Sequence, residues 1–334
     1  MINLVWRTDV HMADVGPSSR TDDWPTTVFG KLTQVAEIAR EVKAAAILDG
    51  GDFYHIKAPA RNSHDLVRRT AEHHANYPCP VYCTPGNHDC VYGDHSFLPQ
   101  QPLGVLFASG VFKKLYGEHE AVFSEQPDWN ELIEDPTRAP KLKVRVVGIP
   151  YPGPKSSLDL FKAITRGDED VLICVAHVLA SSKGGSMFEG EDIFRYSDLL
   201  DTAPDVFCFG HWHMDQGVEV LGGKTFINIG SLTRGSLSQD EVQRRPAAAV
   251  ISCTNNGVSV EVRRLSVAPA EEVFDVDARN RQVRQQVEMD AFVTRIRDGL
   301  QTKLEGGSLV DVINAVSNVP NEIRERALAY LEKV

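Results

Sequence analysis

The feature of this sequence that most constrains its fold is a series of short apolar runs, each followed by polar residues. The first three runs are INLVWRT, AAAILDGG and CPVYCTPG, which begin at residues 2, 44 and 79. Residues 61–74, between the second and third runs, have a helical pattern. The residues between the first two runs have a helical spacing of about 3.6, set by Val28, Leu32, Val35, Ile38 and Val42. This alternation predicts a β-α-β-α-β unit with parallel strands.

Three further apolar runs follow in the middle of the chain, namely KLKVRVVGIPY, DVLICVAHV and PDVFCFGHWH. Two hairpins are predicted after them, one turning at residues 222–223 and the other at residues 255–257. Beyond residue 269 the pattern becomes helical, with one apolar face formed by Phe292, Ile296, Leu300 and Leu304. We therefore expect a domain over residues 1–268 and a helical C-terminal region over residues 269–334.

The charge and cysteine content limit the environment in which the protein works. A net charge of −11 counts against a broad attraction to nucleic acid, because Lys and Arg provide most of the affinity for phosphate. Any binding of DNA must then be local or assisted by metal ions. The N-terminus lacks the pattern of a signal peptide, and no apolar run is long enough to span a membrane. Six scattered cysteines without a CxxC pair indicate buried thiols in a reducing compartment, so we expect a cytoplasmic protein without a membrane partner.

Residue types that bind metal ions recur at the ends of five apolar runs. A single histidine in such a place is more often a surface or core residue than a ligand, but five recurrences favour a common site. Carboxylate and amide oxygens suit Mn²⁺ and Mg²⁺, while imidazole suits Mn²⁺, Fe and Zn²⁺. The recurring residues are Asp9, His11, Asp52, His55, Asn87, His88, His177, His211 and His213.

This set of ligand types predicts a pair of divalent ions. One carboxylate can bridge two ions, and Asp52 is the expected bridge because the two glycines before it let the backbone approach closely. We expect Mn²⁺, with Mg²⁺, Zn²⁺ or Fe as alternatives. The sequence has no P-loop, no GxSxG elbow and no kinase-like HRD set, so those chemistries are not indicated.

Five blocks of the sequence resemble the calcineurin-like metallophosphoesterases and occur in that family's order. They are DVH at 9–11, GDFYH at 51–55, GNHD at 86–89, His177, and GHWH at 210–213. The resemblance spans residues 1 to about 235. It implies an α/β fold of mixed α+β type, a four-layer αββα sandwich of two mixed sheets, with a two-metal site at the strand ends. The C-terminal helices would form a small extension of this fold.

The resemblance also implies a role for each residue of the site. It assigns Asp52 to both metal ions, Asp9, His11 and His213 to the first ion, and Asn87, His177 and His211 to the second. His88 would stabilise the transition state or protonate the leaving oxygen. An imidazole, whose ordinary pKa is about 6.5, suits that role near neutral pH.

Within the family, the sequence is most similar to DNA-repair exonucleases. These are the SbcD subunit of bacterial SbcCD, its meiotic-recombination counterparts and phage recombination nuclease subunits. The similar residues are His55, GIPYP at 148–152 and NIGSLTRG at 228–235. This similarity implies that His55 orients the phosphodiester and that Ser231 and Arg234 lie near the site. It implies a metal-dependent DNA nuclease of repair or recombination, with exonuclease or endonuclease action, in a cell or encoded by a phage and active in the host cytoplasm.

Two other functions stay open. The first is a phosphodiesterase or phosphatase that acts on small molecules, and the second is a scaffold without catalysis, against which the complete ligand set counts. The chain also departs from the family in two places. Thr8 stands where the family usually has Ser, and only about 100 residues follow the GSLTRG stretch, where larger members carry a capping domain.

The resemblance finally implies partners for two segments. Related nucleases pair their subunits at helix 61–75 and residues 102–110, where an apolar patch predicts a homodimer; the alternative is that these residues line the core. The basic helix over 279–304 and the final helix have more apolar face than a short appendage can bury. Related nucleases dock such helices on an SMC-like ATPase; the alternative is a bundle on the catalytic domain. The patch consists of Leu103, Val105, Leu106 and Phe107, and the last apolar face of Ile323, Ala327 and Leu331.

Overall fold

The computed structural model describes the chain in two compact units, Met1–Val273 and Phe274–Val334. The predicted boundary at residue 268 falls just before the end of the first unit. The structure describes residues 1–55, 62–91, 94–125, 141–183, 190–275, 310, 313–314 and 321–331. The first unit contains all the candidate site residues.

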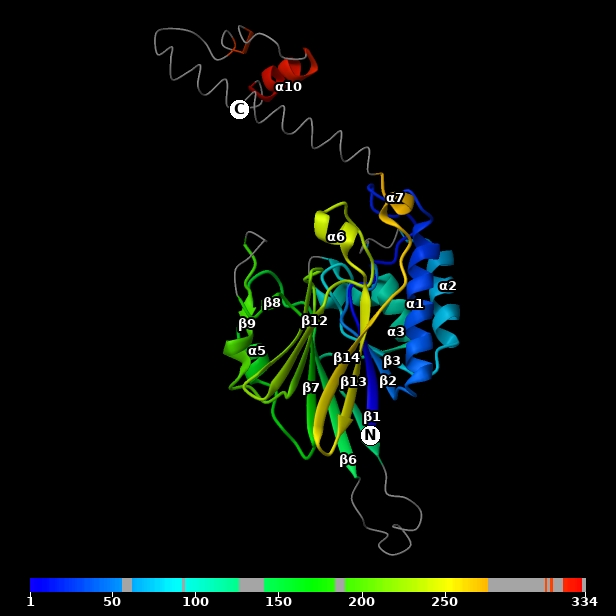
Figure 1. Ribbon diagram of the computed structural model, residues 1–334, viewed down its shortest axis with the longest axis vertical. Helices are drawn as coiled ribbons and strands as arrows, with labels where there is room; N and C mark the ends of the chain where they lie inside the picture. The colour runs from blue at the N-terminus through cyan, green and yellow to red at the C-terminus, as the bar shows by residue number, and fades with distance from the viewer. Residues whose placement is uncertain are drawn as a thin grey trace, which may run out of the picture. The chain divides into compact units, whose positions relative to one another are not determined.

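The first unit contains two six-stranded sheets (Figure 1). The first sheet has the order β14-β13-β1-β2-β3-β4, in which β1 to β4 are parallel and β13 and β14 pair antiparallel. Its strands are β1 (Ile2–Arg7), β2 (Ala46–Asp49), β3 (Val81–Cys83), β4 (Phe112–Lys114), β13 (Ala247–Thr254) and β14 (Gly257–Arg264). The predicted parallel β-α-β-α-β unit is confirmed, as is the hairpin that turns before Gly257, where φ is 120°.

The second sheet has the order β11-β12-β10-β7-β6-β5. Its four central strands are parallel, and its two edge strands are antiparallel to their neighbours. The strands are β5 (Ala121–Glu125), β6 (Leu142–Ile149), β7 (Val171–His177), β10 (Val206–Gly210), β11 (Asp215–Leu221) and β12 (Lys224–Ile229). The three apolar runs of the middle of the chain are therefore β6, β7 and β10, and the hairpin at residues 222–223 joins β11 to β12.

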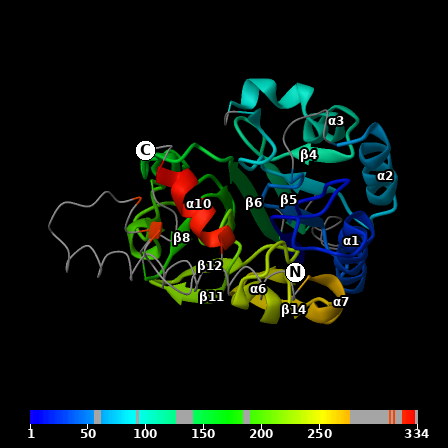
Figure 2. The ribbon, with the colours of Figure 1, turned by 90° about the horizontal axis from the view of Figure 1, so that it is seen from above.

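Alternation of side chains along the strands builds the layers. Leu4 and Trp6 of β1 belong to the core between the two sheets, whereas Val5 packs under the helices on the other face. Those helices are α1 (Trp24–Glu41), α2 (His64–Ala75) and α3 (Pro102–Ala108), which lie together beside the first sheet when the molecule is seen from above (Figure 2). The expected fold of two packed mixed sheets is confirmed.

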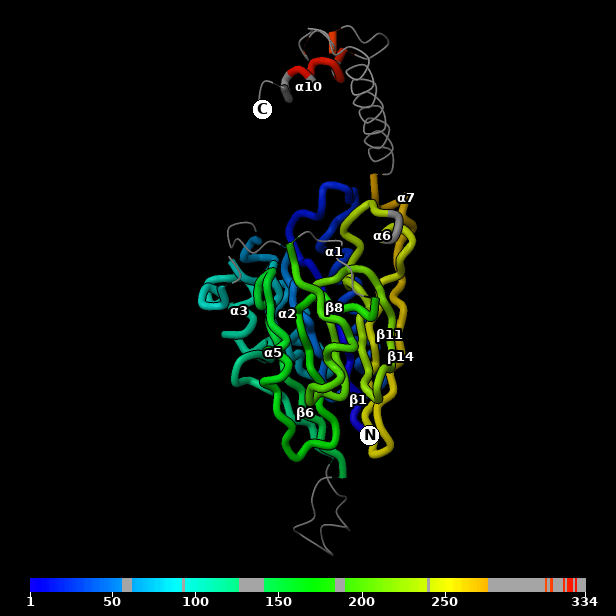
Figure 3. The backbone as a smooth tube through the Cα atoms, turned by 90° about the vertical axis from the view of Figure 1, so that its left-hand side faces the viewer, coloured from blue at the N-terminus to red at the C-terminus, as the bar shows by residue number. Residues whose placement is uncertain are grey.

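The outer face of the second sheet carries a thinner layer, which is turned toward the viewer in Figure 3. Phe207 and Phe226 stack there with Tyr196, whose ring lies 4.5 Å from that of Phe226. The layer consists of α5 (Asp159–Lys162), a 3-10 turn over Tyr196–Leu199, and the paired strands β8 (Ala180–Ser181) and β9 (Phe194–Arg195). Two short helices, α6 (Gln239–Gln243) and α7 (Ala270–Val273), lie toward the end of this unit.

The prediction of an exposed apolar patch on α3 is wrong. Leu103, Leu106 and Phe107 are buried in the core under the helices, and only Val105 is exposed, at 50%. Residues three and four apart share one face of a helix, so these three side chains point the same way and Val105 points away. The homodimer stays a prediction without this support.

The second unit contains α10 (Asn321–Leu331) among its described residues. The helix predicted over 279–304, with its basic residues and apolar face, lies outside the described residues. Among the helices that the structure describes, none combines the length and the apolar character needed to cross a bilayer.

Candidate metal centre

The five blocks lie at the carboxyl ends of five parallel strands from the two sheets. Asp9 and His11 follow β1, Asp52 and His55 follow β2, and Asn87 and His88 follow β3. His177 is the last residue of β7, and His211 and His213 follow β10. Parallel strands end at the same edge of a sheet, so residues far apart in sequence meet there. The first sheet supplies the carboxylates, and the second sheet supplies three imidazoles.

Among the described residues, two groups built around Asp52 could each hold a metal ion. In the first group, one ligand atom from each of Asp9, His11, Asp52 and His213 lies within 4.8 Å of the others. In the second, the same holds for Asp52, His177 and His211. All six residues were predicted as ligands from the sequence, and the structure brings them together in the expected two sets. Asn87 adjoins the second set, because its Oδ1 lies 3.2 Å from His177 Nε2.

The first group is formed where three loops meet. His11 Nε2 lies 2.9 Å from His213 Nε2, and His213 Nε2 lies 3.5 Å from Asp9 Oδ1. Asp9 is held in place by the Thr8 hydroxyl, which donates a hydrogen bond of 2.5 Å to Oδ2, and by the backbone N–H of His211 at 3.1 Å. Two imidazole nitrogens and a carboxylate oxygen thus converge on one point, which is the arrangement that a divalent cation needs.

The second group is more enclosed. His177 is fully buried, and its Nε2 lies 3.4 Å from Asp52 Oδ2. Its other nitrogen, Nδ1, lies 2.6 Å from the carbonyl of Gly50, which can only accept a hydrogen bond. His177 therefore carries a proton on Nδ1 and directs Nε2 toward Asp52.

One buried oxygen gives a direct test of whether these residues suit a cation. Asp52 Oδ2 is buried and accepts no hydrogen bond, although Oδ1 accepts one of 2.7 Å from the His88 backbone. A buried carboxylate oxygen that accepts no hydrogen bond is costly unless a positive charge neutralises it, either a bound cation or the protonated His177, whose Nε2 lies 3.4 Å away. Gly86 leaves room at this point, because a Cβ there would lie 2.1 Å from Asp52 Oδ1 and 2.6 Å from His177 Cε1. The donor set and the space both fit a metal ion shared by Asp52.

The backbone around these residues is unusual. Five described residues other than glycine have positive φ, and four of them belong to the two groups. A left-handed conformation costs an L-residue roughly 1–2 kcal/mol and is retained where the surrounding structure demands it. The four residues are Asp9 (52°), His11 (53°), Asp52 (50°) and His211 (85°), and the fifth is Lys43 (51°).

The pKa values follow from the crowding of opposite charges. Burial acts to raise the pKa of Asp9 and Asp52, but their contacts with His213 and His177 outweigh it, so both pKa values lie well below the usual range. Burial acts to lower the pKa of His177, but Asp52 raises it to about 9. Burial and the charge of His213 lower the pKa of His11. The two carboxylates are therefore ionised, and protons on the neighbouring imidazoles balance their charge. A bound cation would take the place of those protons.

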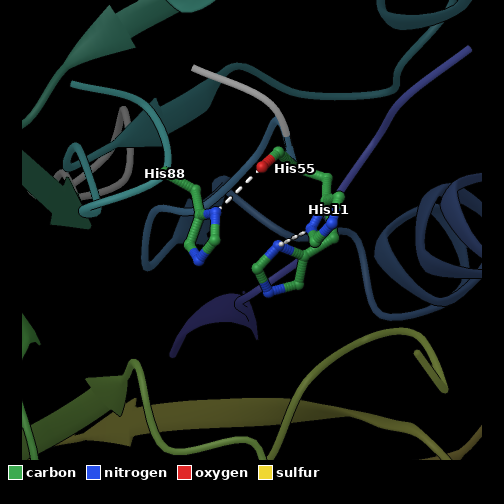
Figure 4. Close-up of side chains that lie close together, drawn as sticks. All are labelled: His11, His55 and His88. Atoms are coloured by element: carbon green, nitrogen blue, oxygen red, sulfur yellow. Dashed lines mark hydrogen bonds between the residues drawn. The ribbon is translucent and has the colours of Figure 1, made fainter. Parts of the chain in front are cut away.

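His55 and His88 stand beside the first group (Figure 4). His55 Nδ1 lies 3.4 Å from His11 Nδ1, and His88 Nδ1 donates a 2.8 Å hydrogen bond to the carbonyl of His55. The rings of His55 and His88 are stacked, with centroids 5.4 Å apart. His88 therefore turns Nε2 toward the site, 4.0 Å from Asp52 Oδ2, and its side chain is 35% exposed. Together with His11 they form a third group of ligand atoms within 4.8 Å.

Three residues around the site were given no role from the sequence, although Asp89 is the last residue of the GNHD block. Asp89 accepts hydrogen bonds from the backbone of Phe53, Tyr54 and Gly86, so it ties the loop after β2 to the loop after β3. Glu191 and Tyr151 contact His211. The GIPYP stretch was a signal for Tyr151, whereas no motif marks Glu191.

Ser231 and Arg234, which were expected near the site, make mainly contacts that hold the backbone in place. The Ser231 backbone donates to the carbonyl of His213, so Ser231 does adjoin the site. The Arg234 guanidinium donates to the carbonyls of Val242 and Ala268.

Comparison with known proteins gives one family and several distant structures. The family model of the calcineurin-like phosphoesterases matches residues 8–215, more than half of the chain. No curated protein sequence is significantly similar to this chain. Protein TT1561 of Thermus thermophilus has 13% identity and a TM-score of 0.44, over 78% of this chain and 98% of that one. A dimetal phosphatase from Danio rerio has 12% identity and a TM-score of 0.47, over 79% of this chain and 96% of that one.

Proposed function

The chain belongs to the calcineurin-like phosphoesterase family, and from this premise we propose that it is a metal-dependent DNA nuclease. Membership of the family and the clustered ligand types support hydrolysis of phosphoesters by a metal-dependent enzyme. The nuclease function, the ion Mn²⁺ and the role of each residue are the proposal. The alternative is a phosphodiesterase or phosphatase of small molecules.

In this proposal Asp9, His11, Asp52 and His213 hold one ion. Asp52, Asn87, His177 and His211 hold the other. Two divalent ions so held supply Lewis acidity and activate water near neutral pH. Asp52 is the shared ligand because it belongs to both groups and its Oδ2 is buried without a hydrogen-bond partner.

The other two histidines act on the substrate. His88 directs Nε2 toward the site and is fixed through Nδ1, so it can give a proton to the leaving oxygen. His55 lies on the same side, next to His11 and stacked on His88. A second imidazole there can hold a non-bridging oxygen of a phosphodiester while His88 meets the leaving oxygen. This juxtaposition of His55 and His88 is the observation that carries the choice of a diester substrate.

The test compares substrates under one condition. Purified protein with Mn²⁺ is given linear duplex DNA, single-stranded DNA, bis-p-nitrophenyl phosphate and p-nitrophenyl phosphate. The proposal expects cleavage of DNA and of the bis ester, and little release from the monoester. Asp52→Asn serves as the matched inactive control. Rapid hydrolysis of the monoester with intact DNA would favour the small-molecule phosphatase instead.

Partners and location complete the proposal. We retain a homodimer, a cytoplasmic location and docking of the region beyond residue 269 on an SMC-like ATPase. Light scattering of the full chain at micromolar concentration tests the dimer, and a monomer would contradict it. Co-purification of the full chain with a co-expressed SMC-like ATPase tests the docking.

A further inference from the structure

We propose that Glu191 is a positioning residue that fixes the ring of His211, so that Nδ1 of His211 faces the second metal ion, and that Tyr151 holds Glu191 for this task. The inference rests on the proposed function, because it takes His211 as a ligand. It adds two side chains that lie outside the five sequence blocks.

The contact between His211 and Glu191 is short and sheltered. His211 Nε2 lies 2.8 Å from Glu191 Oε2, and the two side chains are 12% and 23% exposed. An ionised carboxylate only accepts hydrogen bonds, so the imidazole places its proton on Nε2. Nδ1 is then the nitrogen that we assign to the metal ion. Histidine ligands commonly donate their second N–H in this way, which fixes both the tautomer and the ring orientation.

Glu191 lies behind the ligand rather than among the ligands. The second group of ligand atoms within 4.8 Å consists of Asp52, His177 and His211, and Glu191 is not part of it although it is a described residue. The residues around the contact leave a cavity of only about 10 Å³. That is room for about one water molecule. The carboxylate can therefore act on the ion only through His211.

Tyr151 fixes Glu191 from the other side. The Tyr151 hydroxyl donates a 3.0 Å hydrogen bond to Glu191 Oε1, so both carboxylate oxygens are bonded. The Tyr151 ring lies 5.1 Å from that of His211, and its backbone N–H donates to the carbonyl of Pro85 at 3.0 Å. Pro85 begins the turn that carries Asn87. Tyr151 thus connects the loop after β6 to two ligand-bearing loops.

The other imidazole of the second group shows why a side chain is needed here. His177 is oriented by the Gly50 carbonyl at 2.6 Å, which is supplied by the backbone just after β2 of the first sheet. His211 lies beyond the end of β10 with φ of 85°, and Glu191 is the acceptor that meets its Nε2. The two imidazoles are thus fixed in the same manner by different groups.

The experiment measures binding of Mn²⁺ to the full chain by calorimetry, together with the electron paramagnetic resonance signal of coupled Mn²⁺ pairs. We expect Glu191→Ala to weaken one of the two binding steps by about 10–100-fold, the usual effect of removing such a partner. The other step should stay within twofold. Glu191→Gln keeps an acceptor for Nε2 and should restore most of the loss, and Tyr151→Phe should weaken the same step by less.

Asp192→Asn is the matched control, because Asp192 is adjacent in sequence and pairs with Lys155 instead. It should leave both steps unchanged. If Glu191→Ala binds two ions as tightly as the parent chain, the inference is overturned and the proposed function stands. If both steps weaken equally in Glu191→Ala, the residue has a general structural role and the inference is also overturned. A parent chain that binds no pair of ions overturns the proposed function, and the inference with it.

Discussion

The two halves of the proposed metal centre share Asp52 but are built differently. In the first half, the His213 side chain is 46% exposed, and His11 faces another imidazole, that of His55. In the second half His177 is fully buried, and each imidazole meets an oxygen acceptor, the Gly50 carbonyl or Glu191. The second half is therefore preorganised before an ion arrives, while the first half is exposed to solvent at His213. We expect the second half to bind its ion more tightly and the first half to exchange its ion and meet the substrate.

The largest expected effect comes from removing what the two halves share. Asp52→Asn takes away a charge from both ion positions while keeping an oxygen near the His88 backbone N–H. Phosphodiester cleavage should fall by more than the roughly 10²–10⁴-fold that a general acid contributes. Elemental analysis should show that both ions are lost or weakened. Asp201→Asn, at an exposed position, is the control; cleavage by Asp52→Asn at the parental rate would contradict the shared ligand.

His88→Ala should separate the chemistry from the ions. His88 belongs to neither of the two ligand groups around Asp52, so the variant should bind metal almost normally. Its cleavage rate should drop by roughly 10²–10⁴-fold, because the leaving oxygen loses its proton donor. Metal content and rate are measured on the same sample, with the exposed His119→Ala as the control. Loss of an ion from the His88→Ala protein would identify His88 as a ligand instead.

The difference between the two halves predicts an order of metal release. Titration with a chelator should remove one Mn²⁺ well before the other, with affinities that differ by about 10–100-fold, the range set by the groups that orient the ligands. His213→Ala should abolish the weaker step, and His177→Ala the tighter one. Two steps of equal affinity, or the reverse assignment, would show that burial and fixed acceptors do not decide the order.

Much of this centre could be predicted because its ligands lie directly after strands that the apolar runs reveal. Asp9, Asp52 and His177 follow from that rule, since parallel strands end at one edge. Glu191 could not be predicted in this way. It lies in a loop before β9, far from any strand end of the site, and only folding brings it against His211.

The sequence contained a further signal on α3 that a count of apolar residues overlooks. Leu103, Leu106 and Phe107 are three and four residues apart, which is the spacing of a buried helix face, and Val105 falls on the opposite face. The apolar content alone suggested an exposed patch, whereas the periodicity indicates a core. Loop packing determines which residues outside the motifs support the ligands. Local sequence patterns do not encode that packing.

The smallest expected effect concerns Thr8, the position at which the resemblance to the family would lead one to expect Ser. Thr8 is buried, and its hydroxyl donates to Asp9 Oδ2 in the open first half. Thr8→Ser keeps that hydroxyl and loses one methyl group, so cleavage should stay within about twofold while the free energy of unfolding falls by about 0.8 kcal/mol. Thr8→Val keeps the shape and loses the hydroxyl, and a hydrogen bond to a charged group contributes about 1.5–3 kcal/mol. Thr8→Val should therefore lose more Mn²⁺ affinity than Thr8→Ser. The loss should appear in the weaker of the two Mn²⁺ binding steps, because Asp9 belongs only to the first group. Calorimetric titration of both variants with Mn²⁺ measures the affinity of each binding step. If Thr8→Val weakens the tighter step instead, the two halves are coupled through the strand ends and do not bind their ions independently.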